Sequence, residues 1–422
     1  MRPYISFLVK NKTLNYPIFR NYLVMRLAII MALNMQITVI SYLVYRITKD
    51  QLSLGIIGLA EVIPAIVFSL FSGHFVDQRE KKTTLMQVVI AYLALSAFFI
   101  MLATNSFQAM AGKDITVWLI YAGVFVSGII RAFLSPATFA LLGLIIPKKH
   151  YANASIWSSS AWHMGAIVGP LLGGFIIALS GFSTSLTIVF LLILISFVAL
   201  LRIPKQAIHS NGKEPIMKSL GEGLRFVFST QAVLAALSLD MFAVLFGGAT
   251  ALLPVYADDI LKVGEIGFGW LRAAPAIGAI IMSAFLAFIP LKTKAGPKLL
   301  WSIAGFGITT IIFGISTNFW VAFFALLLGG AFDQISVIIR GTILQLYTPD
   351  NMRGRVAAVN TMFISSSNEL GAMESGLTAK WMGTVPAVVF GGIMTMVVVG
   401  VTYFSAPVLK TLKLDPNEKD KT

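Results

Sequence analysis

The sequence predicts an all-α membrane protein with twelve transmembrane helices in two pseudo-symmetric six-helix bundles. Three observations lead to this fold class. Of the 422 residues, 57% are hydrophobic and only 12% are charged, whereas soluble domains carry about 25% charged residues. Apolar runs recur along the whole chain, and each is long enough for the roughly 20 residues that cross a bilayer as a helix. A polar stretch in the middle of the chain separates these runs into two sets of six.

The apolar runs and the charged segments between them predict the position of each helix. The first bundle covers residues 1–202, a cytoplasmic linker covers 203–230, the second bundle covers 231–407 and a cytoplasmic tail covers 408–422. The linker is assigned because it combines several basic residues with two prolines in one polar stretch. The twelve spans are expected at 18–45, 54–76, 83–104, 115–146, 152–179, 183–201, 231–257, 266–290, 298–316, 319–347, 355–381 and 384–407.

The distribution of Lys and Arg predicts the orientation in the membrane. Of the 32 basic residues, 23 lie on the side of the N-terminus, the linker and the tail, only 4 lie on the opposite side, and 5 lie within spans. Short cytoplasmic loops carry such an excess. We therefore expect both termini in the cytoplasm. The formal charge of +14 follows from the loops and does not indicate a nucleic-acid partner.

The two bundles share a short repeat. Asn153 and Asn360 are each followed five residues later by three serines, an offset of 207, and Gly169 and Gly376 keep the same offset. A duplicated six-helix unit explains this repeat. The alternative is that small residues recur by chance in the fifth and eleventh spans because both helices pack closely.

The turn between the second and third spans carries charged residues at fixed positions. The residues that match Gly-x-x-x-Asp-Arg-x-Gly-Arg-Arg are Gly73, Asp77, Lys81 and Lys82. Gln78 and Glu80 depart from this pattern, which resembles the loop signature of the major facilitator superfamily. The resemblance implies that Asp77 closes the cytoplasmic side by meeting the start of the eleventh span near Gly354 and Arg355, where the helix N-terminus favours a carboxylate.

Two further motifs resemble exporters of that superfamily. The fifth span is similar to an exporter signature at Gly165, Gly169, Pro170, Gly173 and Gly174. Glycines four residues apart allow close helix packing, and packing alone is the competing interpretation. The stretch from Arg340 to Gly376 resembles the bacterial subgroup that includes enterobactin exporters and macrolide efflux proteins, although Ala372 stands where many members carry another acid.

The resemblance implies a major facilitator fold and a function. We expect a secondary active transporter that exports small amphipathic compounds, drug-like or siderophore-like, by proton-coupled alternating access. It would work as a monomer in the bacterial inner membrane, with its substrate, protons and lipid as partners. The alternatives are a lipid or lysophospholipid transporter of the same fold and, more remotely, a non-transporting membrane sensor. No metal, nucleotide or nucleophile motif is present, so neither an enzyme nor a cofactor is expected.

Acidic residues within spans are costly and are the candidates for proton coupling. The candidates are Asp240, Glu61, Glu369, Glu374 and Asp333. Each has a competing interpretation as a fixed ion-pair partner. Asp240 ranks first because it lies near the middle of the seventh span. We expect Asp240→Asn to abolish gradient-driven export without affecting folding.

Basic and polar residues within spans are the candidates for the substrate cavity. The candidates are Arg26, Asn34, Thr38, Ser41, Arg131, Ser336 and Arg340. Four first-span residues form one polar stripe, which lines the cavity or hydrogen-bonds a neighbouring helix: Asn34, Thr38, Ser41 and Tyr45. Ser336 and Arg340 share one face of the tenth span with Asp333. An arginine stays protonated, so it would bind an anionic group or stabilise a neighbouring carboxylate.

Overall fold

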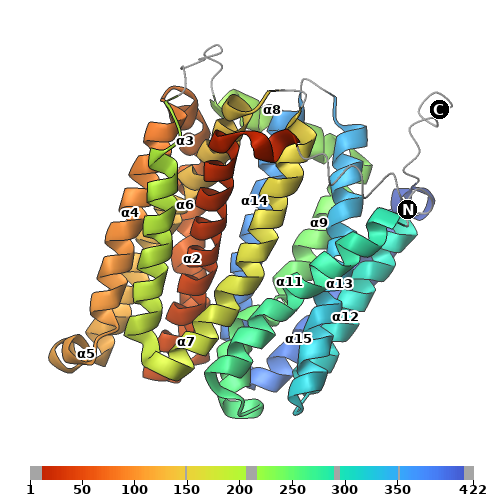
Figure 1. Cartoon of the computed structure of the whole chain (residues 1–422). Coiled ribbons are helices and arrows are strands. Elements are labelled where there is room, and N and C mark those ends of the chain that lie inside the picture. The colour runs from red at the N-terminus through yellow and green to blue at the C-terminus, as the bar shows by residue number, and fades with distance from the viewer. Residues whose placement is uncertain (1–11, 148–149, 206–215, 289–294, 350–351, 413–422) are drawn as a thin grey trace. The chain divides into compact units, whose positions relative to one another are not determined.

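The computed structural model describes residues 12–147, 150–205, 216–288, 295–349 and 352–412 (Figure 1). In this described part, every regular element is a helix. The chain divides into two compact units: unit 1 contains Met1–Leu43 and Ile63–Gly212, and unit 2 contains Val44–Val62 and Lys213–Thr422. The first half of the second span therefore packs with unit 2. The division into bundles 1–202 and 231–407 stays a prediction.

Unit 1 contains the helices expected for the first six spans. A short 3-10 helix, η1 (Lys12–Asn15), precedes them. Two helices, α5 and α6, are joined by Gly112, whose φ of 82° lies in the left-handed region that suits glycine. The helices that contribute to unit 1 are α2 (Pro17–Thr48), α3 (Gln51–Asp77), α4 (Lys81–Leu102), α5 (Asn105–Ala111), α6 (Lys113–Ile145) and α7 (Tyr151–Leu201).

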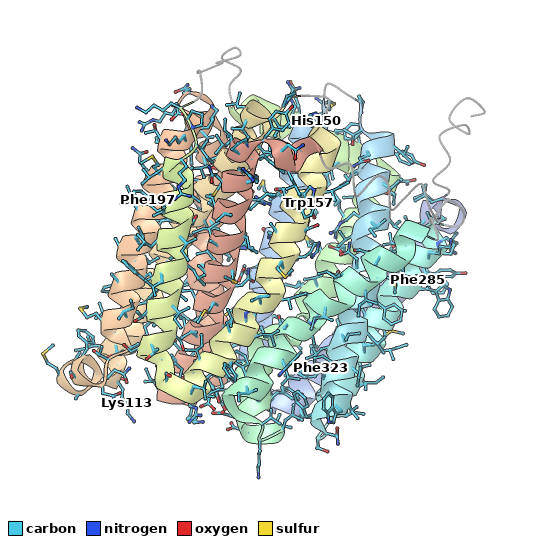
Figure 2. All side chains as sticks on the ribbon, viewed as in Figure 1. Lys113, His150, Trp157, Phe197, Phe285 and Phe323 are labelled. Atoms are coloured by element: carbon cyan, nitrogen blue, oxygen red, sulfur yellow. The ribbon has the colours of Figure 1, made fainter. Side chains whose placement is uncertain are left out.

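Helix α7 contains two spans joined by a sharp turn. Gly181 has a φ of 78° within α7, and Figure 1 shows that the chain reverses its direction in this helix. The two parts correspond to the expected spans 152–179 and 183–201. Figure 2 shows Lys113 and His150 at opposite ends of the unit 1 helices. Since Lys113 begins α6 and His150 precedes α7, α6 crosses the full length of the unit.

Unit 2 contains the linker helix, the remaining spans and a short terminal helix. The expected seventh span is interrupted after Gly247, where the helix gives way to a 3-10 turn and then to a π-helix. Its elements are α8 (Ile216–Ser229), α9 (Gln231–Gly247), η3 (Ala249–Leu252), α10 (Leu253–Val255), η4 (Tyr256–Ile260), α11 (Gly264–Phe288), α12 (Ala295–Ile315), α13 (Phe319–Tyr347), α14 (Arg353–Met382), α15 (Thr384–Ser405) and α16 (Val408–Thr411).

Ten helices in the described part are long and apolar enough to cross a membrane. The two spans of α7 count as one of these, and the 30-residue helix α14 is not among them. Helix α14 carries acidic and amide side chains along its length, which lower its hydropathy. Its length is sufficient for a span, so the helices are consistent with the twelve expected. The all-helical membrane fold is confirmed.

Both units have a closely packed interior. In unit 1, the aromatic side chains of Tyr22, Tyr92 and Phe99 are fully buried. In unit 2, one buried apolar cluster joins residues of α9, α12, α13 and α14, among them Leu237, Leu299, Ile339 and Val359. Aliphatic and aromatic burial of this kind fixes the helices that carry the charged side chains described next.

Candidate functional site

The charged turn between α3 and α4 is organised by helix capping. The Nζ atom of Lys81 donates to the carbonyl oxygen of Val76 at 2.5 Å, near the last turn of α3. Glu80 caps the start of α4, because its carboxylate accepts the main-chain N–H groups of Lys82 and Thr83 at 3.0 and 2.6 Å. The departure of Glu80 from the expected pattern therefore has a structural reason, since a carboxylate suits a helix N-terminus.

Lys82 links this turn to the end of α7. Its Nζ atom donates to the carbonyl oxygen of Leu201 at 3.1 Å, and the lysine side chain is buried. Both lysines of the motif thus donate to carbonyl groups near helix C-termini, where a positive charge is favourable. Gly73 and Asp77 lie in the last two turns of α3, and the surroundings of Gly73 and the side chain of Asp77 are outside the described part. The contact of Asp77 with the start of α14 stays a prediction.

The first span of α7 packs closely against α2 through its glycines. A Cβ atom at Gly165 would lie 2.7 Å from the side chain of Ile30, and one at Gly169 would lie 2.7 Å from the carbonyl oxygen of Met31. At Gly173 the nearest atoms are 3.5 Å away, which is ordinary contact. Glycine at the first two positions is therefore needed for the approach of the two helices.

Gly169→Ala is expected to lower the free energy of unfolding by about 1–3 kcal/mol, because the new methyl group would overlap main-chain atoms of α2. Gly173→Ala is the matched control, one turn further along the same helix face. With room for a Cβ atom there, it should be neutral or slightly stabilising, by up to about 1 kcal/mol. Thermal unfolding of the purified variants in detergent measures both changes, and equal losses would contradict this packing argument.

The polar stripe of α2 faces the same contact. The amide of Asn34 donates to the carbonyl oxygen of Ile30 at 2.9 Å, and the hydroxyl of Thr38 donates to that of Asn34 at 2.6 Å. The Asn34 side chain lies 3.0 Å from the position that a Gly169 Cβ atom would take. Thr38 and Ser41 are buried. Both of these hydrogen bonds stay within α2, so the cavity role of the stripe and the alternative of a hydrogen bond to a neighbouring helix stay predictions.

The remaining exporter-motif residues also lie in the first span of α7. Pro170 is inside the helix, where it removes one main-chain hydrogen bond. Gly174 is buried.

A similar packing recurs in unit 2, where a Cβ atom at Gly371 of α14 would lie 2.8 Å from the carbonyl oxygen of Leu245 in α9. The fifth span thus packs on the first, and the eleventh packs on the seventh.

Arg26 of α2 contacts α7 at Ser158, seven residues before Gly165. Its Nε atom donates to the carbonyl oxygen of Ser158 at 3.0 Å. The hydroxyl of Tyr22 lies 3.4 Å from Ser158 Oγ and donates to the carbonyl oxygen of Thr138 at 3.4 Å. Arg131 of α6 is exposed.

Asp240 and Arg340 form a buried ion pair in unit 2. Arg340 of α13 contacts the Oδ2 atom of Asp240 in α9, and Ser336 donates to its Oδ1 atom at 3.1 Å. All three residues are no more than 5% exposed. Asp240 is therefore fixed by two partners, and neutralising it would leave the Arg340 charge buried. The structure adds a folding cost to Asp240→Asn that the sequence did not indicate.

A second charged group joins α3, α11 and α14. Arg272 of α11 interacts electrostatically with Glu369 of α14 and Glu61 of α3. The helices are held close by small residues: a Cβ atom at Gly58 would lie 2.9 Å from the Cβ atom of Ala372 and 3.4 Å from the Glu369 carboxylate. Ala372, where an acid was noted in the resembled subgroup, thus lies at the α3–α14 contact.

The Arg272 triad, defined as Glu61, Arg272 and Glu369, was only partly expected. Both acids were predicted candidates, whereas Arg272 is one of the five basic residues counted within spans and had no predicted role. Its position N-terminal to Pro275 in a glycine-rich helix carries no motif that would have identified it. Two carboxylates around one guanidinium leave one negative charge in excess, which a single proton can neutralise.

Two predicted acids lie apart from any basic partner. In the described part, no Lys, Arg or His lies within salt-bridge distance of Asp333 or Glu374. Both side chains are partly buried. Asp333 is two turns from Arg340 on α13, and the ion pair of Arg340 is with Asp240 instead. Both acids remain proton-coupling candidates.

The start of α14 is connected to the linker helix. Arg355 forms an ion pair with Glu222 of α8. A Cβ atom at Gly223 would lie 2.9 Å from the carbonyl oxygen of Arg355, so the two helices touch through their main chains. The surroundings of Gly354 lie outside the described part, and the gate role of Gly354 and Arg355 stays a prediction.

The opposite end of unit 2 carries an ion-pair cluster. Arg46 at the end of α2 contacts Asp258 at 3.2 Å and Glu265 at 2.5 Å. Lys49 contacts Asp258 at 3.1 Å and Asp259 at 3.9 Å. The side chains of Arg46 and Lys49 are 42% and 53% exposed. Their partners are less exposed, with the side chain of Asp258 at 9% and that of Glu265 at 25%.

Comparison with known proteins agrees with these features. The model of a family described as transmembrane secretion effector matches residues 12–421. Enterobactin exporter EntS of Shigella boydii serotype 18 is 23% identical over 386 residues, which cover 91% of this chain and 90% of that protein. The same exporter of Escherichia coli O1:K1 is also 23% identical over 386 residues, with the same coverage.

Solved structures show the same fold. The D-xylose-proton symporter matches 94% of this chain and 100% of its own with a TM-score of 0.72 at 11% identity. A bacterial homologue of the human lysosomal transporter Spinster, inward-facing and unoccupied, matches 93% of this chain and 98% of its own with a TM-score of 0.70 at 16% identity. These structures show the fold, and the family model together with the exporter relatives confirms the resemblance that the loop and fifth-span motifs indicated.

Proposed function

Since the chain belongs to the transmembrane secretion effector family of major facilitator transporters, we propose that it exports a small amphipathic compound, drug-like or siderophore-like, in exchange for protons. The relatives named enterobactin exporters support the export direction and the substrate type. The excess of basic residues near the linker and both termini supports a bacterial inner membrane location with cytoplasmic termini. The protein would act as a monomer.

The Arg272 triad carries the proton-coupling part of this proposal. With both carboxylates ionised, the three side chains together carry one net negative charge inside the membrane, where charge is costly. One proton removes that cost and leaves a neutral ion pair. A difference in proton affinity between the two access states couples proton entry to export.

The ion-pair cluster supports alternating access. It links the α2–α3 connection to η4 and α11 by ion pairs whose basic side chains are exposed. Opening of the outer side would separate these side chains. Because the chain has no cysteine, an Ile260→Cys variant reports this opening through labelling by a membrane-impermeant maleimide. We expect labelling to rise under transport conditions, and equal labelling in all conditions would argue against this opening.

Transport by the purified protein in liposomes tests the proposed function. An imposed pH gradient should drive saturable movement of one class of probe among hydrophobic dyes, macrolides and catecholate siderophores. A proton ionophore should abolish this movement. Movement that is independent of the gradient would contradict proton exchange, and no movement of any amphipathic probe would contradict export.

Lipid or lysophospholipid transport is a second candidate because of one apolar groove. The groove lies on α12 and α13 and has a volume of about 340 Å³. Its lining residues are Thr309, Ile312, Trp320, Val321, Phe324, Ala325 and Leu328. A fluorescent lysophospholipid in the same liposomes distinguishes the two functions, since only a lipid transporter would change its leaflet distribution.

A further inference from the structure

Arg26 carries a charge that no carboxylate neutralises in the described part of the chain. Its guanidinium contacts the carbonyl oxygen of Ser158 at 3.0 Å and interacts with the hydroxyl of Tyr22, both of which are neutral groups. No acid lies within salt-bridge distance of it among the described residues. By contrast, Arg340 of unit 2 has a carboxylate partner.

The distribution of acids explains this difference. All five acidic residues predicted within spans, from Glu61 to Glu374, belong to unit 2. In the described spans of unit 1, the ionisable side chains away from the helix ends are Arg26, Arg131 and His163. Arg131 is exposed, so Arg26 is the one partly buried arginine in the described spans of unit 1, and no acid predicted within a span belongs to that unit.

The contacts of Arg26 also orient its guanidinium. The Nε–H group donates to the carbonyl oxygen of Ser158, which is buried, so this edge of the side chain is anchored. The two terminal nitrogens form the opposite edge, whose parallel N–H groups match the two oxygens of a carboxylate, phosphate or sulfonate. Arg26 itself is only partly buried, so a ligand can reach it.

From the uncompensated charge, the anchored Nε and the partial exposure, we propose that Arg26 is the anion-recognition residue of a binding site in unit 1. The ligand is an amphipathic molecule with an anionic group that contacts the terminal nitrogens of Arg26. This inference rests on the proposed export function and narrows its substrate class to anions. Either an anionic lipid headgroup or an anionic small molecule supplies the required chemistry.

A matched pair of probes tests the charge preference directly. Pyrenebutyrate and a pyrenebutyl-trimethylammonium salt share one apolar body and differ in the sign of the charge. Binding of each to the full-length protein in nanodiscs of zwitterionic lipid is measured by fluorescence titration. We expect the wild type to bind pyrenebutyrate at least about tenfold more tightly than the cation, because a hydrogen bond to a charged group strengthens binding by about this factor.

Variants at two arginines of α2 assign this preference to one side chain. Arg26→Gln should remove the tenfold preference, and Arg26→Lys should retain part of it because a lysine keeps the charge but loses the two parallel donors. Arg20→Gln is the matched control, since Arg20 is exposed at the start of the same helix and should bind as the wild type does. Thermal unfolding of each variant identifies any loss that arises from misfolding.

The outcomes separate this inference from the proposed function. Equal binding of both probes by the wild type, or an unchanged preference in a folded Arg26→Gln protein, would overturn it even if export is observed. Preserved anion preference without transport of any probe would overturn export but not anion recognition. Competition by phosphatidylglycerol, but not by free naphthalenesulfonate, identifies a lipid headgroup as the anion source, and the reverse identifies a small molecule.

Discussion

Asp240→Asn is expected to destabilise the folded protein by about 3–5 kcal/mol, the usual result of removing one partner of a buried ion pair. The cause is Arg340, which is 4% exposed and would keep its charge without a carboxylate. Ser336 would also lose an ionised acceptor for its hydroxyl. Thermal unfolding in detergent, combined with the amount of protein recovered from membranes, measures the loss.

A double variant separates the buried charge from the acid itself. Asp240→Leu combined with Arg340→Met removes both charges, and apolar replacements of a buried pair are often close to neutral in stability. The double variant should therefore be more stable than Asp240→Asn alone. Ser336→Ala, which removes only one hydrogen bond, should cost about 1 kcal/mol. If Asp240→Asn unfolds as the wild type does but no longer exports, the role expected from the sequence is correct and Asp240 couples protons.

Much of the fold could be predicted because it depends on local composition. Apolar runs of about 20 residues define spans whatever their partners are, so α2, α6 and α12 begin and end within a few residues of the expected limits. Interruptions were harder to predict. The break of the seventh span after Gly247 and the turn at Gly181 inside α7 follow from main-chain conformations at single glycines, and many other glycines in the chain are regular helix residues.

The candidate site was predictable as a set of residue types but not as a set of pairs. The shared face of Ser336 and Arg340 follows from helical spacing, whereas their partner Asp240 is 96 residues from Ser336 in the chain. Only the packing of α9 against α13 reveals that contact. Arg272 illustrates the same limit, since its two acids come from two other helices. For Arg340 the sequence left open whether it binds an anionic group or stabilises a neighbouring carboxylate, and the structure shows an ion pair with Asp240.

Glu61→Gln and Glu369→Gln are each expected to abolish gradient-driven export while leaving substrate exchange without a gradient largely intact. Each amide removes the excess negative charge of the Arg272 triad permanently, so the triad resembles its protonated form in both access states. A proton then no longer shifts the equilibrium between those states. Because Arg272 keeps one carboxylate in either variant, neither should leave a buried charge unpaired, and both proteins should fold.

Comparing the two single variants with a double variant provides the most specific test of this prediction. Glu61→Gln combined with Glu369→Gln leaves Arg272 without a carboxylate from the triad and should destabilise the protein, as breaking a buried pair does. Asp114→Asn is the control for loss of one negative charge, because Asp114 is an exposed acid in the first turn of α6.

Gradient-driven transport and gradient-free counterflow are measured in liposomes for all four proteins. Full coupling in both single variants would exclude the triad as the proton site and leave Asp333 and Glu374, the two acids without a basic partner in the described part, as the groups to test next.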